Sequence, residues 1–167
     1  AEGPGALIVF CAPKGAPGRT TLAVNTALSL RAVTGERVLL IDADFSAAAI
    51  DVALNLKHLH DMGDLLPRVG EMDEALMESV LVDHQSGVRA LLAPPAVQGG
   101  SPVAALQMQQ ILRVARRMSE WVVVDLGLPL DDTAYACLLA ADRVVVNVLP
   151  ETIGLRNTRQ MLERMQA

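Results

Sequence analysis

The densest chemical signal in the sequence is a short segment that combines glycines, basic side chains and neighbouring hydroxyls. It reads CAPKGAPGRTT over residues 11–21, directly after an apolar run and directly before a helical pattern. A loop between a strand and a helix can wrap its backbone N–H groups around phosphate oxygens, and the positive end of the helix dipole adds to the attraction. The segment therefore predicts a phosphate-binding loop, with a turn that binds no ligand as the alternative.

This segment departs from the common phosphate-loop pattern G-x-x-x-x-G-K-[ST]. Pro13 stands in place of the first Gly and Arg19 in place of the phosphate-binding Lys, whereas Thr20 keeps the hydroxyl that would hold magnesium. Arg19 keeps a positive charge on a larger planar group, so we expect phosphate binding to survive and hydrolysis to be slow or absent. Ala16 and Pro17 stiffen or crowd the loop, and Pro17 has no N–H to donate.

Carboxylates at the ends of two apolar runs supply a second signal. Asp42 and Asp44 end the run VLLIDAD, and Asp125 ends VVVD. The carboxyl ends of parallel strands meet at one edge of a sheet, so we expect these carboxylates to lie together near the loop. Magnesium nucleotide chemistry needs a hydroxyl, an acidic group and a carboxylate that positions the attacking water. Each Asp alone is equally compatible with a helix N-cap or a strand end, so the prediction rests on their joint occurrence.

The elements that must position these residues alternate along the chain. Short β-rich apolar runs occupy 6–12, 37–43, 88–93, 121–126 and 143–149, and helical patterns occupy 20–33 and 103–118. The alternation predicts a three-layer α/β/α sandwich with a mainly parallel sheet, and the phosphate-loop segment would make it a fold of the P-loop NTPase type. We also expect helical pieces near 61–66 and 72–82, an exposed loop at 93–102, and one apolar face of a terminal helix formed by Leu155, Met161, Leu162 and Met165.

Composition limits the classes of function. The 167 residues are 51% hydrophobic, which suits a single P-loop domain over 1–167, and the net charge of -5 argues against direct nucleic-acid binding. Cys11 and Cys137 lie in apolar runs and are expected to be buried thiols in the cytoplasm. No apolar run is long enough to predict direct membrane insertion. Because the sequence lacks an initiator Met, we expect it to be a fragment of a longer chain.

The order of these motifs resembles the deviant-Walker P-loop ATPase family, which includes the MinD and ParA proteins. The pattern Lys14-Gly15-x-x-Gly18-x-Thr20-Thr21 carries the resemblance, followed by VLLIDAD and VVVDL. A closer likeness, to the ATPase domain of CpaE- and TadZ-type pilus-assembly proteins, is carried by PKGAPGRTTLAVNTAL, DADFSAAAIDVALNL, LLAPP, WVVVDLGLPLDD and ADRVVVNVLPETIGLRNTRQML. In that family the ATPase domain commonly follows a receiver-like domain of the response-regulator kind, and it continues into later strands that this chain would lack.

The resemblance implies ATP or ADP with magnesium as cofactors and a role for each site residue. Asp44 would orient the attacking water with support from Asp42, while Thr20 would coordinate magnesium and Asp125 would hold it through water. Lys14 would act across a nucleotide-sandwich dimer on the phosphates of the partner subunit. The nucleotide-binding residues would be Lys14, Gly15, Ala16, Pro17, Gly18, Arg19, Thr20 and Thr21.

The function implied by the resemblance is that of a nucleotide-responsive localisation or assembly factor. It would form an ATP-dependent homodimer and act on protein partners of a pilus or polar assembly. A slow, genuine ATPase of the MinD/ParA class and a nucleotide-independent pseudo-ATPase scaffold are the alternatives. Arg19 is the residue that separates them, because phosphoryl transfer depends on the placement of positive charge.

Overall fold

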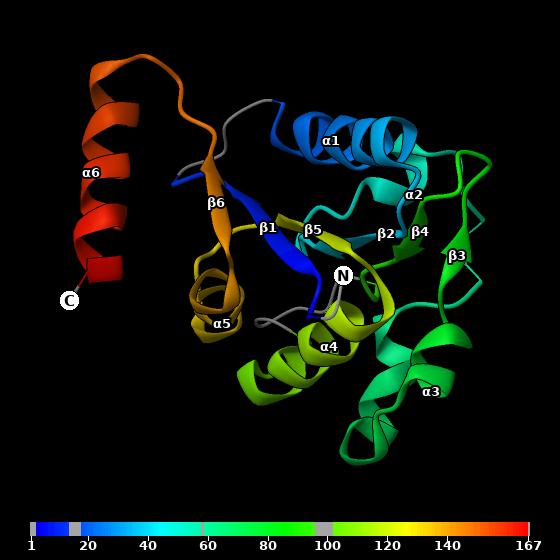
Figure 1. The fold of residues 1–167 in the computed structure, drawn as a ribbon. Helices are drawn as coiled ribbons and strands as arrows, with labels where there is room; N and C mark the ends of the chain where they lie inside the picture. The colour runs from blue at the N-terminus through cyan, green and yellow to red at the C-terminus, as the bar shows by residue number, and fades with distance from the viewer. Residues whose placement is uncertain (1–2, 14–17, 58, 96–101, 167) are drawn as a thin grey trace.

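A six-stranded sheet forms the centre of the computed structural model, which describes residues 3–13, 18–57, 59–95 and 102–166 (Figure 1). The strand order is β3-β4-β2-β5-β1-β6. The strands are β1 (Ala6–Cys11), β2 (Val38–Ala43), β3 (Val82–Asp83), β4 (Arg89–Leu91), β5 (Trp121–Leu126) and β6 (Arg143–Val146). Neighbouring strands pair in parallel except β3, which pairs antiparallel with β4. The predicted mainly parallel sheet is confirmed.

Helices cover both faces of this sheet, which confirms the predicted three layers (Figure 1). One face carries α1 (Arg19–Thr34) and α2 (Ile50–Ala53). The other face carries the 3-10 helix η1 (Met62–Glu71), α3 (Glu74–Glu78), α4 (Ala105–Met118) and α5 (Asp132–Ala140). The last helix, α6 (Thr152–Gln166), lies beyond the edge strand β6.

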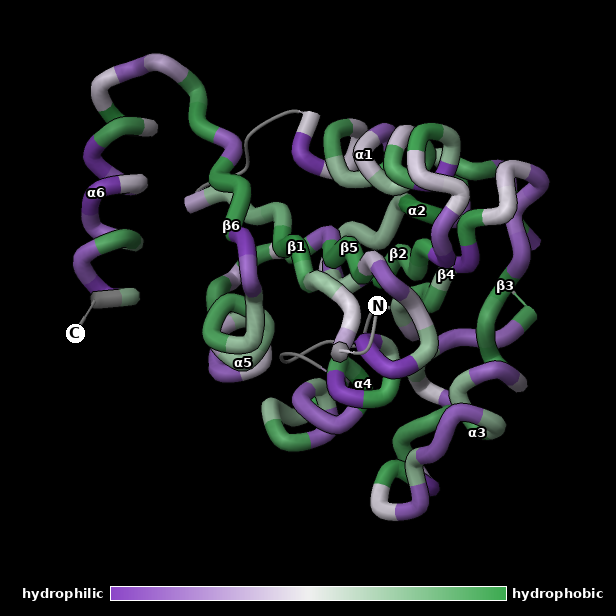
Figure 2. The backbone as a smooth tube through the Cα atoms, in the orientation of Figure 1, coloured by the Kyte–Doolittle hydropathy of each residue, from purple (hydrophilic) through white to green (hydrophobic). Residues whose placement is uncertain are grey.

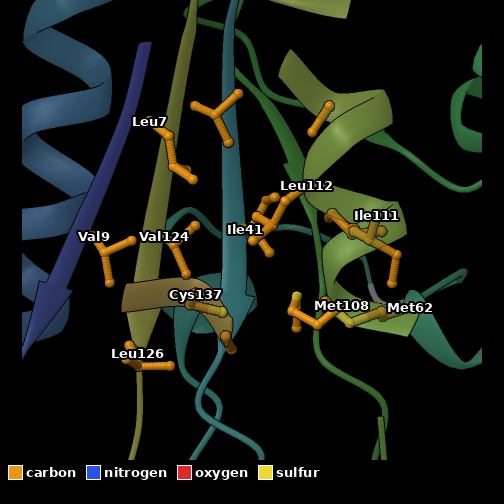
Figure 3. Packing of buried hydrophobic residues seen from close by; sticks show 14 of the residues in the cluster. Leu7, Val9, Ile41, Met62, Met108, Ile111, Leu112, Val124, Leu126 and Cys137 are labelled. Atoms are coloured by element: carbon orange, nitrogen blue, oxygen red, sulfur yellow. The ribbon is translucent and has the colours of Figure 1, made fainter. Parts of the chain in front are cut away.

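Alternating side chains of the central strands build two separate cores. In β2, Leu39 and Ile41 join the cluster under α4 and α5, whereas Leu40 joins the cluster under α1. This division follows from the strand period of two, which points successive side chains to opposite faces. Figure 3 shows Ile41 facing Ile111 and Leu112 of α4, and Figure 2 shows that the central strands are apolar. Both faces of these strands are therefore buried, as the continuous apolar runs predict.

Two predicted helical segments differ from the structure. The piece near 61–66 extends to Glu71 as a 3-10 helix that contains Pro67, which has no N–H to offer an α-helical ladder. The prediction of a helix over 72–82 is wrong at both ends. The helix begins only after Asp73, whose side chain accepts a hydrogen bond from the Leu76 amide, and 82–83 pair with β4 as a strand.

Loop and strand boundaries also need correction. The segment 93–102 does not begin as an exposed loop, because Ala93 and Pro94 are buried; 96–101 lie outside the described residues. The predicted strand over 143–149 ends at Val146, since its partner β1 ends at Cys11. The proposed apolar face of the terminal helix is divided. Met161 is buried in the core cluster, whereas Leu155 and Leu162 are 59% and 43% exposed.

Polar contacts tie the amino ends of the strands together, opposite the carboxyl ends where the predicted site lies. Trp121 begins β5, and its indole Nε1 donates to Glu36 Oε2 at 2.6 Å. Beside it, Arg37 Nη2 donates to Glu120 Oε1 at 2.6 Å in an exposed ion pair. These contacts fix the amino ends of β2 and β5 against each other.

Two further sequence expectations concern cysteines and membranes. Cys11 and Cys137 are free and buried, as expected, and burial raises their thiol pKa values to about 11 and about 12. In the case of Cys11, the charge of Arg19 opposes this rise in pKa. Within the part of the chain that the structure describes, no helix is both long enough and apolar enough to cross a bilayer.

Candidate functional site

The predicted carboxylates lie together at the carboxyl edge of the sheet, beside the start of α1. Asp42 and Asp125 are directly opposed in the parallel register of β2 and β5, and Asp44 follows the end of β2. Gly18 precedes α1 with φ of 93°, in the left-handed region that glycine adopts at least cost. The structure therefore brings the end of the phosphate-loop segment and all three aspartates to one place.

Arg19 connects the helix to two of these aspartates. Its Nε donates to Asp125 Oδ1 at 2.6 Å, and its Nη2 donates to Asp44 Oδ2 at 2.5 Å. Burial disfavours the charge of Arg19, but the hydrogen bonds and charges of both carboxylates outweigh this effect and raise its pKa. The sequence predicts Arg19 as a phosphate ligand. In the structure its guanidinium, on a residue only 9% exposed, binds carboxylates instead.

Thr20 completes the contacts of Asp125. The Thr20 hydroxyl donates to Asp125 Oδ2 at 2.6 Å, so each oxygen of this fully buried carboxylate has a partner from the first turn of α1. Hydroxyl and carboxylate oxygens are ligands that suit magnesium. The described residues contain no group of three or more His, Cys, Asp or Glu placed to hold a metal. Thr20 and Asp125 nevertheless offer two oxygens of the kind that magnesium prefers. Asp125 would be free to bind the ion once Arg19 leaves it.

Asp44 is the centre of a network that joins two loops. Its Oδ1 accepts hydrogen bonds from the amides of Ser46 and Ala47 and from the Ser46 hydroxyl, at 2.9 to 3.2 Å. Burial alone would raise the pKa of Asp44, but Arg19 and these donors lower it below the ordinary value. The Ser46 hydroxyl oxygen also lies 3.0 Å from the Leu128 carbonyl oxygen, so its one proton is shared between Asp44 and Leu128, which links the loop after β2 to the loop after β5.

Asp42 has a different environment from Asp44. Its carboxylate accepts hydrogen bonds from the backbone amides of Asp44, Ala49 and Ile50 at 3.0 to 3.2 Å. Burial raises the pKa of Asp42 to about 6 in spite of these bonds, and the charge of Asp125 acts in the same direction. Asp42 thus holds the backbone of the loop that carries Asp44.

Sequence analysis missed two residues that shape this network. A Cβ added at Gly127 would lie 2.3 Å from Asp44 Oδ1, so only glycine lets the loop after β5 approach so closely. Ser46 follows Asp44 by two residues, and an Asp that accepts from the backbone two residues on is a common turn motif. This spacing is the signal that could have identified Ser46. Nothing local to Gly127 predicts its contact.

The remaining predicted site residues fall into two groups. Gly18 and Thr21 are exposed at the start of α1, and the Thr21 carbonyl accepts a hydrogen bond from Asn25 Nδ2 at 2.8 Å. Lys14, Gly15, Ala16 and Pro17 lie outside the described residues, so their roles in nucleotide binding stay predictions. A pocket of about 670 Å³ lies between the loop after β5 and α6. Its lining is Pro13, Leu128, Pro129, Leu130, Tyr135, Asn157, Gln160, Met161 and Arg164.

A comparison with known protein families identifies the family of this chain. A family model described as an AAA domain matches residues 5–167, so the chain belongs to that family. Its relatives and its fold are those of the MinD/ParA class of P-loop domains. The P-loop class expected from the sequence is therefore confirmed.

Curated relatives match most of this chain but only part of their own length. The antiactivator FleN of Pseudomonas aeruginosa is 27% identical over 160 residues, covering 94% of this chain and 55% of the relative. The septum site-determining protein MinD of Synechocystis is 26% identical over 165 residues, covering 96% of this chain and 59% of the relative. The chain thus spans between half and two thirds of the length of these proteins.

Solved structures of low sequence identity share the fold. A ParA family ATPase from Chlorobium tepidum superposes with a TM-score of 0.84 at 19% identity, covering 95% of this chain and 67% of that chain. MinD from Pyrococcus horikoshii, solved with Mg-ADP, superposes with a TM-score of 0.75 at 18% identity, covering 96% and 65%. These likenesses support the three-layer architecture.

Proposed function

We propose that this chain is the nucleotide-binding domain of a positioning or assembly factor of the MinD/ParA class. The observation that carries the proposal is the contact of Arg19 and Thr20, in the first turn of α1, with Asp44 and Asp125. A basic group, a hydroxyl and two carboxylates at a helix start are the parts that a nucleotide phosphate and its magnesium require. Relatives named for septum site determination and for antiactivation support a role in cellular organisation or control.

The finer proposal is a CpaE- or TadZ-type factor that acts in pilus assembly or polar positioning in the cytoplasm. Five sequence blocks support it, from PKGAPGRTTLAVNTAL to ADRVVVNVLPETIGLRNTRQML. Within this proposal, 1–167 is one P-loop domain of a longer protein, and receiver-like and later segments belong to the rest. Its partners are proteins of the pilus or polar assembly, without direct binding of nucleic acid.

The cofactors that we propose are ATP or ADP with magnesium. Magnesium, when bound, would neutralise charge on the phosphates, with Thr20 and Asp125 as its protein oxygens. Residues 14–21 would hold the phosphates, and Lys14 would reach the partner subunit in a nucleotide-dependent homodimer. Asp44 would position a water molecule, and Asp42 would keep the Asp44 loop in place through its backbone hydrogen bonds.

Slow hydrolysis is part of the proposal, and Arg19 is the reason for it. Its guanidinium is held by Asp125 and Asp44 in the absence of ligand, and its planar fork is larger than the ammonium group of lysine, so we expect it to meet a transferring phosphate in a less favourable position. An error of about 1 Å in placement can cost on the order of a hundredfold in rate. The same observation favours a second candidate, a scaffold that needs no nucleotide, because Arg19 already neutralises charge in the site.

Calorimetry with ATP and ADP in the presence of magnesium tests nucleotide binding directly. We expect binding in the micromolar to millimolar range, with a matching rise in melting temperature as occupancy increases. A folded protein that shows neither heat nor thermal shift with millimolar nucleotide would exclude the nucleotide-binding function and leave the scaffold.

Sedimentation of the wild type and of Lys14→Ala, each with and without nucleotide, tests the dimer. We expect a nucleotide-dependent dimer for the wild type and a weaker one for the variant, since each Lys14 would contact the partner subunit. Only monomer in all four samples would refute the dimer, whereas the same substantial dimer fraction in all four would refute its dependence on nucleotide and support the scaffold.

A further inference from the structure

Arg19 stands at the position of the phosphate-binding lysine in the loop pattern, and its side chain is already bound to two carboxylates. One edge of its guanidinium carries both hydrogen bonds, to Asp125 at 2.6 Å and to Asp44 at 2.5 Å. A guanidinium fork binds carboxylate and phosphate oxygens with the same geometry, so the two kinds of anion compete for it. Asp125 is fully buried and Asp44 is 6% exposed, so water has little access to these ion pairs.

We infer that Asp44 and Asp125 hold Arg19 in place of a phosphate group, so that a polyphosphate binds by drawing Arg19 away from the two carboxylates. The inference rests on the proposed function, because the ligand and the site are the same. It adds a ligand-free state in which Arg19 is paired with the two carboxylates. Binding then exchanges the hydrogen bonds between Arg19 and the carboxylates for hydrogen bonds between Arg19 and the phosphate. The measured affinity of the polyphosphate reflects the difference in free energy between these two sets of bonds.

The contacts of Asp44 show how opening would spread from this site. When Arg19 leaves, the Asp44 carboxylate loses its counter-charge while it still accepts from Ser46 and Ala47. The Ser46 hydroxyl bridges Asp44 and the carbonyl of Leu128, and Leu128 lies 82 positions after Ser46. A change at Arg19 is therefore passed to the loops after β2 and β5 by direct contact, which couples phosphate binding to both loops.

The two oxygens of Asp44 allow a sharp test of the competition. Oδ1 accepts from the Ser46 and Ala47 amides, whereas Oδ2 accepts from Arg19. The substitution Asp44→Asn can keep the Oδ1 contacts and replaces Oδ2 with an N–H group that cannot accept. It removes one competitor for Arg19 with little change in volume. A hydrogen bond to a charged group corresponds to roughly 10- to 150-fold in an equilibrium constant, and Asp125 stays in place, so we expect the lower end.

Calorimetry with inorganic tripolyphosphate and with ATP, at constant magnesium, measures this competition. Asp44→Asn should bind either ligand about tenfold more tightly than the wild type. Glu120→Gln is the matched control, because it removes one negative charge from a 2.6 Å arginine pair at the opposite end of β5, and it should stay within about twofold. In an Arg19→Gln background, Asp44→Asn should give no gain. Unchanged or weaker binding by folded Asp44→Asn would refute the exchange.

The two ligands separate failure of this inference from failure of the nucleotide function. Tripolyphosphate that binds more tightly to Asp44→Asn, with no ATP binding by any variant, would support the exchange and exclude the nucleotide. ATP that binds equally to the wild type and Asp44→Asn would leave the function and refute the exchange. Absence of binding by both ligands in every variant would refute both.

The wild type gives a second measurement that does not depend on the folding of a variant. The Nε–H proton of Arg19 donates to Asp125 and should give a separate nitrogen-correlated NMR signal. Arg19→Lys would assign this signal by its loss. Saturation with tripolyphosphate should shift it, and a signal that stays constant at saturation would refute the exchange.

Discussion

Replacing Arg19 with methionine should destabilise the fold strongly, because the substitution leaves buried carboxylates without their cation. Asp125 is fully buried and Asp44 is 6% exposed, and each accepts from Arg19 at 2.6 Å or less. Removal of one partner from a buried ion pair costs about 3 to 5 kcal/mol. Some charge is still stabilised by Thr20 and by backbone amides, so we expect a loss of about 3 kcal/mol in the free energy of unfolding.

Urea unfolding followed by far-ultraviolet circular dichroism measures this loss as a lower midpoint at constant slope. Thermal melts should fall by about 6 to 12 °C for a domain of this size. Arg37→Met is the matched control, since Arg37 donates to Glu120 at the same 2.6 Å but its side chain is 59% exposed. An exposed pair contributes about 1 kcal/mol or less, so the control should change little.

A combined variant tests the cause of the loss. Adding Asp44→Asn and Asp125→Asn to Arg19→Met removes the unpaired charges and should restore part of the stability, because neutral groups cost less to bury. The reasoning is refuted if Arg19→Met costs no more than Arg37→Met. A combined variant that is less stable than Arg19→Met alone would show that packing, and not charge, causes the loss.

Further predictions concern glycine, pH and thiols. Gly127→Ala should lower the free energy of unfolding by about 1 to 3 kcal/mol, because its Cβ would lie 2.3 Å from a carboxylate oxygen; Gly70→Ala, with no atom within 4 Å of its Cβ, should be nearly neutral in thermal melts. Burial raises the pKa of Asp42 from 3.8 to about 6, so the folded state binds this proton more tightly than the unfolded state. The stabilisation that the bound proton gives is complete below pH 3.8 and is lost as pH rises through 6. Relative to Asp42→Asn, the wild type should lose on the order of 3 kcal/mol between pH 3.8 and 7 in urea titrations, and a constant difference would contradict the raised pKa. Because burial raises the pKa values of Cys11 and Cys137 to about 11 and about 12, a thiol reagent should label them only after unfolding; rapid labelling of native protein would contradict their burial.

The sequence was sufficient to predict the sheet and the meeting of the carboxylates. Buried strands appear as continuous apolar runs, and parallel strands all end at the same edge, so Asp42, Asp44 and Asp125 had to lie close together. The extent of the 3-10 helix through Glu71 and the two-residue strand at 82–83 were not predictable in this way. Such short elements depend on tertiary partners more than on a local period.

The direction of Arg19 was the main feature that the sequence could not supply. A long cationic side chain at a helix start can bind phosphate or carboxylate, and residue type alone does not decide between them. Asp125 and Asp44 settle the choice here, and they lie 106 and 25 positions away in the chain. The Ser46 contact with Leu128 is likewise long-range. These contacts follow from the register of β2 and β5, which no local pattern encodes.

Trp121, the only tryptophan, gives the domain a natural fluorophore with a useful location. It begins β5, whereas Asp125 lies four residues later, about 13 Å further along the same strand. The indole also has its own hydrogen-bond partner in Glu36. Its emission therefore reports disruption of the far end of the sheet and is insensitive to a ligand arriving beside Arg19. In one sample, unfolding can be followed optically while ligand binding is followed by heat, without interference between the two signals.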